Sequence, residues 1–297
     1  MSKQLSVTIG IPTYVGGPSL VNAVKSIRQS KGAEAARLIV TVDANPLTQD
    51  VTKALTAMGV EIIENKARGG QVVRLKQLIA MTKTDLLITT QDDIRFESDT
   101  VQKIIDKFMS DQTITMVGAR VLPDTATTLH EQVVEVGVKL TLSIGGSWNS
   151  GDNYLMASGR CLAFNTQFIQ KFSIPDTMIN SDAFFYFENR RLGGKFAHLP
   201  TAIVYNKSAQ KIDEHLKQSK KFQLSYDELS HLLDIDFDKD YKVPTGIKVA
   251  ETAKMLLKNP VFTLLYLLLS VYTRYLGKQI FKPGQRYWDT DQSTKRV

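Results

Sequence analysis

The chain has a single cysteine, Cys161, among its 297 residues. An intramolecular disulfide and a zinc site built on several cysteines are therefore excluded, and a reducing compartment fits. Charged residues make up 23% and hydrophobic residues 43% of the chain, which is ordinary globular usage. This composition excludes intrinsic disorder, collagen-like repeats and a small disulfide-rich scaffold.

Most of the chain also lacks any excess of charge. Residues 1–241 carry 27 basic and 27 acidic side chains, whereas residues 242–297 carry 10 basic and 3 acidic ones (10 − 3 = +7). The sequence has no basic recognition helix, zinc finger or aromatic RNA-binding motif, which argues against a nucleic-acid partner. A basic segment beside an apolar stretch instead favours an anionic membrane surface as partner.

No charged region followed by an apolar segment opens the sequence, as it would in a secretory signal. We therefore expect a cytoplasmic protein that is peripheral on the inner face of the cell membrane.

The apolar run Asn259–Thr273 is 15 residues long and uncharged, and its expected apolar face holds four leucines. As a helix it would cover about 22 Å, less than the bilayer core of about 30 Å. We favour an interfacial helix. A buried or dimer-forming helix and a spanning helix that recruits Arg274 and Tyr275–Gly277 remain alternatives. The four leucines are Leu264, Leu265, Leu268 and Leu269.

Segments with strand composition alternate with segments of helical spacing over residues 1–120. This alternation predicts an α/β fold with a doubly wound, mostly parallel sheet. Ligands bind such sheets at the carboxyl ends of the strands, where Asp43, Asp92 and Asp93 fall. The predicted strands are Leu5–Ile11, Leu38–Val42, Val60–Ile63, Leu86–Thr90 and Thr115–Ala119, and the predicted helices are Ser19–Gln29, Gln49–Met58, Val72–Met81 and Asp99–Met109.

The pattern is less regular after this part, and we expect a main domain over residues 1–241 and a helical, membrane-associating tail over residues 242–297. The further expectations are strands at Val133–Leu142, Arg160–Phe164, Phe196–His198 and Ala202–Tyr205, and helices at Asn180–Leu192 and Lys207–Leu233.

Two adjacent carboxylates, Asp92 and Asp93, directly follow an apolar strand. Mg²⁺ or Mn²⁺ would relieve their repulsion and keep coordination positions for diphosphate oxygens. The alternative is a solvated pair that caps the next helix. Asp43 closes a neighbouring strand, where its carboxylate can accept hydrogen bonds from a base or ribose, or can simply start a turn before Asn45.

An ordered set of motifs resembles the inverting family-two glycosyltransferases over about residues 5–206. The resemblance implies a nucleotide-sugar fold of GT-A type with a small mixed part on the acceptor side. It also implies direct displacement on a nucleoside-diphosphate sugar by a hydroxyl of a glycan or lipid-linked acceptor. The motifs are Val7–Tyr14, Asp43, Gly69-Gly70, Thr90–Asp93, Ser158–Phe164, Asn180–Phe185, Arg190, Gly193 and Pro200–Tyr205.

The resemblance also implies roles for single residues. Asp93 would bind the metal and Asp182 would be the catalytic base, although Asp182 can alternatively cap its helix. This chain has Ser181 where the family has Glu before the base, and Asn206 where the family often has a metal-contacting His. The residues expected to bind the nucleotide sugar are Pro12, Tyr14, Asp43, Gly69 and Asp92.

Other side chains have two open interpretations each. Trp148 would stack on an acceptor or lie in the core. Arg68, Arg74 and Lys76 flank the Gly69-Gly70 pair and would reach phosphates or stay solvated.

Two competing functions remain at this stage. Nucleotidyltransferases share related sheet architecture but usually carry a basic glycine-rich loop after the first strand, and Tyr14–Ser19 contains no Lys or Arg. A sugar-nucleotide-binding membrane scaffold is disfavoured by the presence of Asp93 and Asp182, and kept open by Ser181 and Asn206.

Overall fold

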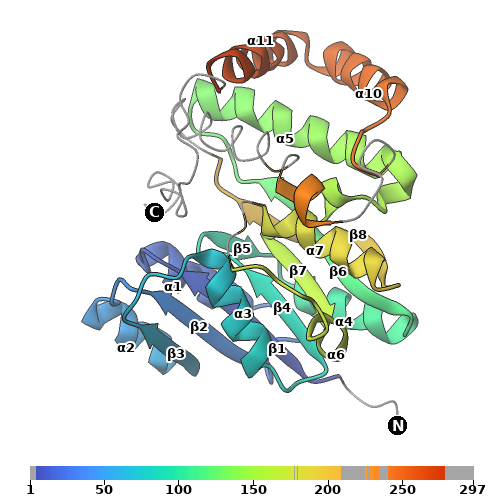
Figure 1. Cartoon of the computed structure of the whole chain (residues 1–297). Helices are drawn as coiled ribbons and strands as arrows, with labels where there is room; N and C mark the ends of the chain where they lie inside the picture. Colours follow the sequence, from blue (N-terminus) through green and yellow to red (C-terminus); the bar gives the residue numbers. More distant parts are fainter. Residues whose placement is uncertain are drawn as a thin grey trace.

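The computed structural model describes residues 5–176, 178, 180–208, 225, 228–233 and 240–277. Its centre is an eight-stranded sheet with the strand order β3-β2-β1-β4-β7-β6-β8-β5 (Figure 1). The strands are β1 Val7–Thr13, β2 Arg37–Asp43, β3 Val60–Asn65, β4 Leu86–Thr90, β5 Ile94–Phe96, β6 Ile114–Pro123, β7 Cys161–Asn165 and β8 Lys195–Asn206.

The first half of the sheet is parallel and the second half is mixed. Strands β3, β2, β1 and β4 run parallel to one another, whereas β7 lies antiparallel between β4 and β6. Strand β8 runs parallel to β6, and β5 pairs antiparallel with β8. The predicted strands of residues 1–120 are all present, and the expected mixed part is confirmed.

Helices cover both faces of the sheet. Helices α1, α2 and α4 contribute to one core cluster, and α3, α6 and α7 contribute to the other. Successive side chains of β2 point to opposite faces of the sheet, so Leu38 and Val40 belong to the first cluster and Ile39 to the second. The doubly wound arrangement is therefore confirmed. These helices are α1 Pro18–Arg28, α2 Gln49–Ala57, α3 Gln71–Met81, α4 Thr100–Ser110, α6 Thr166–Ile169 and α7 Ser181–Arg191.

The predicted strand Val133–Leu142 is wrong, because this segment lies inside the helix α5, Leu129–Ser147. Its valines favour a strand locally, but a capping box starts a helix upstream of them. The backbone N–H of Glu131 donates to Oγ1 of Thr128 at 3.2 Å, and the backbone N–H of Thr128 donates to the Glu131 carboxylate at 2.9 Å. Tertiary packing and this cap decide the segment.

The two short strands expected around Pro200 are one long strand, β8. Its register with β6 shifts between Ala119 and Arg120, which pair with Leu199 and Ile203. Proline has no N–H to donate to the ladder, so the irregularity accommodates Pro200 without breaking the strand.

Two C-terminal helices, α10 (Thr245–Lys258) and α11 (Pro260–Gly277), lie on the outer side of α5, away from the sheet (Figure 1). None of the described helices combines the length and the apolar character needed to cross a membrane. Most of the predicted helix Lys207–Leu233 falls outside the described residues. The domain boundary at residue 241 stays a prediction.

Candidate functional site

The strand register places the expected nucleotide-binding residues at one edge of the sheet. Pro12 lies opposite Thr41, so Tyr14, which follows β1, and Asp43, which ends β2, lie at the same edge of the sheet. Strand β4 pairs with β1 on the side opposite to β2 and ends at Thr90, separated by one residue from the Asp92-Asp93 pair. This edge is the one at which doubly wound sheets bind ligands.

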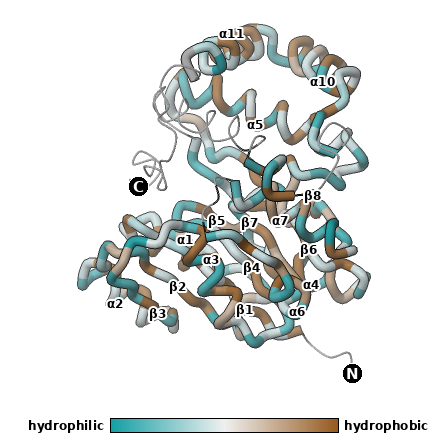
Figure 2. The backbone as a smooth tube through the Cα atoms, viewed as in Figure 1, coloured by the Kyte–Doolittle hydropathy of each residue, from teal (hydrophilic) through white to brown (hydrophobic). Residues whose placement is uncertain are grey.

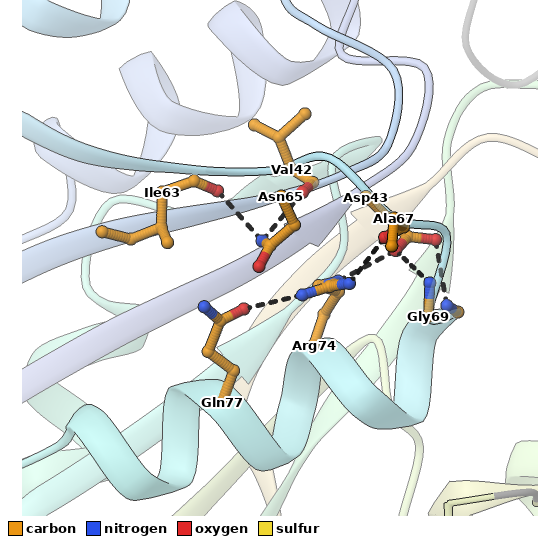
Figure 3. A network of polar contacts seen from close by, with 9 residues as sticks. Val42, Asp43, Ile63, Asn65, Ala67, Gly69, Arg74 and Gln77 are labelled. Atoms are coloured by element: carbon orange, nitrogen blue, oxygen red, sulfur yellow. Dashed lines mark hydrogen bonds and ion pairs between the residues drawn. The ribbon is translucent and has the colours of Figure 1, made fainter.

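Asp43 is a buried carboxylate that holds the loop before α3 (Figure 3). Its Oδ1 accepts from the backbone N–H of Gly69 at 2.7 Å and from Nε of Arg74 at 2.9 Å. Its Oδ2 accepts from the backbone N–H of Gly70 at 3.0 Å. Gly70 has a φ of 82°, a left-handed conformation that brings its N–H toward the carboxylate at little cost. Gly69 and Asp43, which were both expected to bind the nucleotide sugar, are therefore in contact.

The carboxylate of Asp43 keeps capacity for one further donor. A carboxylate has about four lone-pair positions, and these three bonds use two on Oδ1 and one on Oδ2. The chain turns sharply at Ala44, whose φ of 64° is left-handed. The orientation of Asp43 is therefore fixed by this backbone turn as well as by its three hydrogen bonds. The remaining position can accept from a base N–H or a ribose hydroxyl.

The three basic residues around Gly69-Gly70 separate into different roles. Arg74 was expected to reach a phosphate or to stay solvated. Instead it is 7% exposed, and its guanidinium donates to Asp43 and to the carbonyl of Ala67. The guanidinium of Arg68 lies over the ring of Tyr14, 4.3 Å from the centroid, which joins the β1 and β3 loops. Lys76 forms an ion pair with Asp176 at the surface.

Asp92 is tied to the end of β1. Oγ1 of Thr13 donates to Oδ2 of Asp92 at 2.5 Å and accepts from the backbone N–H of Gly16 at 3.0 Å. Asp92 is buried, while Asp93 is half-buried. The expected solvated pair is therefore not observed, and Asp92 serves partly to hold the loop after β1.

The position of Asn206 bears on a metal site. It pairs with Ile94 across β5 and β8, so it lies beside the residue that follows Asp93. No three His, Cys, Asp or Glu side chains converge as a metal site within the described parts of the chain. Two carboxylates and an amide oxygen fit Mg²⁺ or Mn²⁺, since these ions take few protein oxygens when diphosphate oxygens complete the shell.

Asp182 lies against the backbone of Gly159. A Cβ at Gly159 would lie 2.2 Å from Oδ1 of Asp182, so only glycine leaves room for the carboxylate in this position. The N-cap of α7 is Asn180, whose side chain accepts from the backbone N–H of Ala183 at 3.3 Å. The alternative in which Asp182 caps the helix is therefore wrong. Oγ of Ser181 donates to Oδ1 of Asp182 at 3.1 Å.

A short chain of contacts places Asp182 near the aspartate pair. Oγ1 of Thr90 donates to the carbonyl of Arg160 at 2.6 Å. Arg160 follows Gly159, and Thr90 precedes Asp92 by two positions. The segments that carry the base candidate and the metal candidate are thus linked where β4 and β7 pair.

Arg160 adds a cation at this junction. Its Nε is buried and makes no hydrogen bond with the described part of the protein. A buried guanidinium nitrogen is costly without an acceptor, and guanidinium groups match phosphate oxygens in geometry.

Trp148 is 5% exposed and packs edge-on against Tyr154, with ring centroids 5.8 Å apart. Tyr154 in turn stacks on Tyr241 at 4.3 Å. Trp148 and Tyr154 belong to two short 3-10 helices, η1 (Trp148–Gly151) and η2 (Tyr154–Met156). This burial matches the core interpretation of Trp148, and its contact with an acceptor stays a prediction.

Sequence reasoning assigned no role to Thr13, Gly159 or Arg160, although all three lay within its motifs. Their contacts join segments that are far apart in the chain, so no local pattern marks them. Only the glycine at position 159 was a signal, since a glycine beside a strand often marks a close backbone approach.

The sequence model of the family described as glycosyl transferase family 2 matches residues 8–171, more than half of the chain. No curated protein matches the chain by sequence.

Solved structures with the same fold include a mannosyltransferase from Pyrobaculum calidifontis in complex with GDP-Man and Mn²⁺. It is 12% identical, with a TM-score of 0.60 over 95% of this chain and 77% of that chain. Glucosyl-3-phosphoglycerate synthase from Mycobacterium tuberculosis, in complex with Mn²⁺, UDP and phosphoglyceric acid, is 15% identical. Its TM-score is 0.54 over 78% of this chain and 80% of that chain. These likenesses establish an α/β fold of GT-A type.

Proposed function

Because the chain belongs to glycosyl transferase family 2, we propose that it moves a sugar from a nucleoside-diphosphate sugar to an acceptor hydroxyl, with inversion at the anomeric carbon. The acceptor is a glycan or a lipid-linked saccharide. The observation that carries this proposal is the contact of Asp182 with Gly159, beside the Arg160–Thr90 bond that leads to Asp92 and Asp93.

The position of Asp182 supports the base role. Among the described residues its carboxylate accepts one hydrogen bond, from Ser181, and it does not cap α7. In the proposed step it takes the proton of the acceptor hydroxyl while the acceptor oxygen forms a bond to the anomeric carbon. The bond from that carbon to the diphosphate oxygen breaks, its electron pair stays on the oxygen, and the nucleoside diphosphate leaves. Attack opposite the leaving group inverts the centre.

Donor binding is assigned to residues at the carboxyl ends of β1 and β2. Asp43 would accept from the base or ribose through the open position on Oδ2, with Pro12 and Tyr14 forming the wall of the nucleoside site. Arg68 over Tyr14 would cover the nucleoside, and Arg160 would donate to a diphosphate oxygen.

A divalent cation, Mg²⁺ or Mn²⁺, belongs to this proposal. Asp93 would hold it, with Asp92 and Asn206 beside it. When bound, such an ion neutralises the charge that the departing diphosphate gains. The Mn²⁺ in the complexes from Pyrobaculum calidifontis and Mycobacterium tuberculosis supports this assignment.

The cellular setting is proposed from charge and surface. We place the enzyme at the inner face of the cell membrane, in the synthesis of a surface glycan, because the whole net charge of +7 lies beyond residue 241. An acceptor embedded in that membrane would then be within reach of the site. An oligomer formed through α10 and α11 is the competing use of these helices.

Incubation with a panel of nucleoside-diphosphate sugars, Mn²⁺ and a membrane lipid extract tests the proposal. Release of nucleoside diphosphate that depends on the extract is expected. Release of pyrophosphate from a nucleoside triphosphate and a sugar phosphate would indicate a nucleotidyltransferase. Tight donor binding without any release would indicate the scaffold function.

A further inference from the structure

Helix α11 buries polar side chains against the rest of the protein and exposes much of its apolar surface. Thr263 and Thr273, which face the rest of the protein, are at most 2% exposed. The ring of Tyr266 lies over Gly137 of α5, where a Cβ would come within 2.1 Å of it. Three leucines and two valines are exposed on the opposite, outer side, whereas Leu267 and Leu269 are half-buried. A helix that docks only to stabilise a fold buries its apolar stripe, so this one is built for a second contact.

The outer side of α11 is a continuous apolar stripe. Its members recur at intervals of three and four residues, which places them on one face of a helix. Figure 2 shows the apolar character running along α11. A stripe of this length is larger than the isolated apolar residues normal on a protein surface. The exposed residues are Val261 (63%), Leu264 (53%), Leu265, Leu268 (68%), Val271 (69%), Tyr272 and Tyr275.

The charges that accompany this stripe are basic. Helices α10 and α11 carry four basic residues, all of them exposed, against one acidic residue, Glu251 (4 − 1 = +3). The basic residues are Lys248, Lys254, Lys258 and Arg274. Glu251 is 5% exposed and forms an ion pair with Lys254 at 2.7 Å, so the net positive charge at the surface comes from Lys248, Lys258 and Arg274. Its carboxylate accepts from Oγ of Ser143 at 2.5 Å and from Oγ of Ser147 at 2.9 Å.

These charges select the occupant of the stripe. Two copies of the chain would bring like charges together across an α11–α11 contact, which disfavours a dimer. An anionic bilayer attracts the basic residues and offers an acyl layer to the leucines at the same time. Tyr272 and Tyr275 fit the boundary between headgroups and acyl chains.

We propose that the outer face of α11, together with the exposed lysines of α10, is a docking surface for an anionic membrane, on which α11 lies in the plane of the bilayer. Glu251 and Tyr266 fix this surface to α5. Helix α5 continues through η1 and η2 to Gly159 and Arg160. Docking would therefore hold the acceptor side of the site in a set orientation to lipid.

Vesicle flotation of the purified full chain tests this surface without any sugar transfer. We expect the protein to float with vesicles of phosphatidylcholine and phosphatidylglycerol at low salt, and to bind vesicles of phosphatidylcholine alone at least tenfold more weakly. Leu268→Glu should reduce binding to the anionic vesicles at least tenfold. Val271→Glu, on the same face, should do the same.

Met109→Glu is the matched control, since Met109 of α4 is 40% exposed and the substitution makes the same charge change away from α11. It should float as the unchanged protein does. The proposal is overturned if the full chain stays in solution with anionic vesicles, or if Leu268→Glu floats normally. It is equally overturned if the chain sediments as a dimer that Leu268→Glu dissociates.

This inference extends the proposed membrane setting, and its failure is separable from failure of the proposed chemistry. Asp182→Asn should float normally while losing transfer. A protein that transfers sugar but does not float keeps the enzyme assignment and loses the docking surface.

Discussion

Gly159 and Asp182 fit against each other so closely that any side chain at position 159 displaces the carboxylate: a Cβ there would lie 2.2 Å from Oδ1 of Asp182. The atom in the way is the end of a side chain that can rotate, so the clash moves Asp182 rather than the fold.

Gly159→Ala should therefore fold normally and transfer sugar at least tenfold more slowly, because a displaced base loses the alignment on which proton transfer depends. The measurements are turnover and thermal unfolding. Gly146→Ala is the control, since a Cβ at Gly146 meets nothing within 4 Å. Equal turnover in both variants would mean that the position of Asp182 does not matter.

The ion pair of Arg74 with Asp43 is buried, with side chains 8% and 6% exposed. Arg74→Met leaves that carboxylate buried without its cation, and we expect the free energy of unfolding to fall by about 3–5 kcal/mol. Nucleotide affinity should fall too, because the Gly69-Gly70 loop loses an anchor. Denaturant unfolding and calorimetry measure the two effects.

Lys76→Met provides the comparison, since the pair of Lys76 with Asp176 is exposed. It should cost about 0–1 kcal/mol. If Arg74→Met proves no more costly than Lys76→Met, the carboxylate of Asp43 does not depend on Arg74.

Metal dependence is expected to reside in Asp93. Asp93→Ala should abolish the Mn²⁺-dependent part of donor binding, and Asn206→Ala should weaken it, because Asn206 lies beside Ile94. Titration calorimetry with and without Mn²⁺ checks both. The assignment fails if Asp93→Ala retains metal-dependent binding of unchanged strength.

The stability that the contact between α10 and α5 contributes should depend on pH. Hydrogen bonds from Lys254, Ser143 and Ser147 lower the pKa of Glu251 from 4.5 to about 2. A carboxyl group whose pKa is lowered in the folded state stabilises it above the unfolded pKa, and this stabilisation is lost as pH falls toward the folded pKa.

The unchanged protein should therefore be more stable than Glu251→Gln near neutral pH, and the gap should close between about pH 4.5 and about pH 2. Thermal unfolding across this range measures it. A gap that stays constant down to the lowest pH would show that ionised Glu251 adds nothing to this stability.

The parallel half of the fold was predictable because its signals are local: apolar strands, helical spacing and aspartates at the ends of two strands, β2 and β4. The strand predicted at Val133–Leu142 failed because its valines outweighed the capping box of Thr128 and Glu131, which is also readable from sequence. The short strand β5 was missed because three residues carry no periodic signal.

The site was predictable in part. Asp43, Asp92 and Asp93 were found from their places at strand ends, and Asp182 from the family resemblance. The bond of Thr13 to Asp92 joins residues 79 positions apart. The roles of Arg74 and Gly159 likewise depend on contacts that only the folded chain creates. The exposure of Trp148 and of α11 bears on their interpretation, and exposure cannot be derived from composition.

The central claim is that Asp182 removes the proton of the acceptor. Asp182→Asn keeps the size of the side chain and removes its basicity, so donor affinity should be unchanged while nucleoside diphosphate release in the presence of acceptor falls about 10²-fold or more. The rate of that release, compared between the unchanged enzyme and Asp182→Asn, is the most direct test. Equal rates would contradict the account.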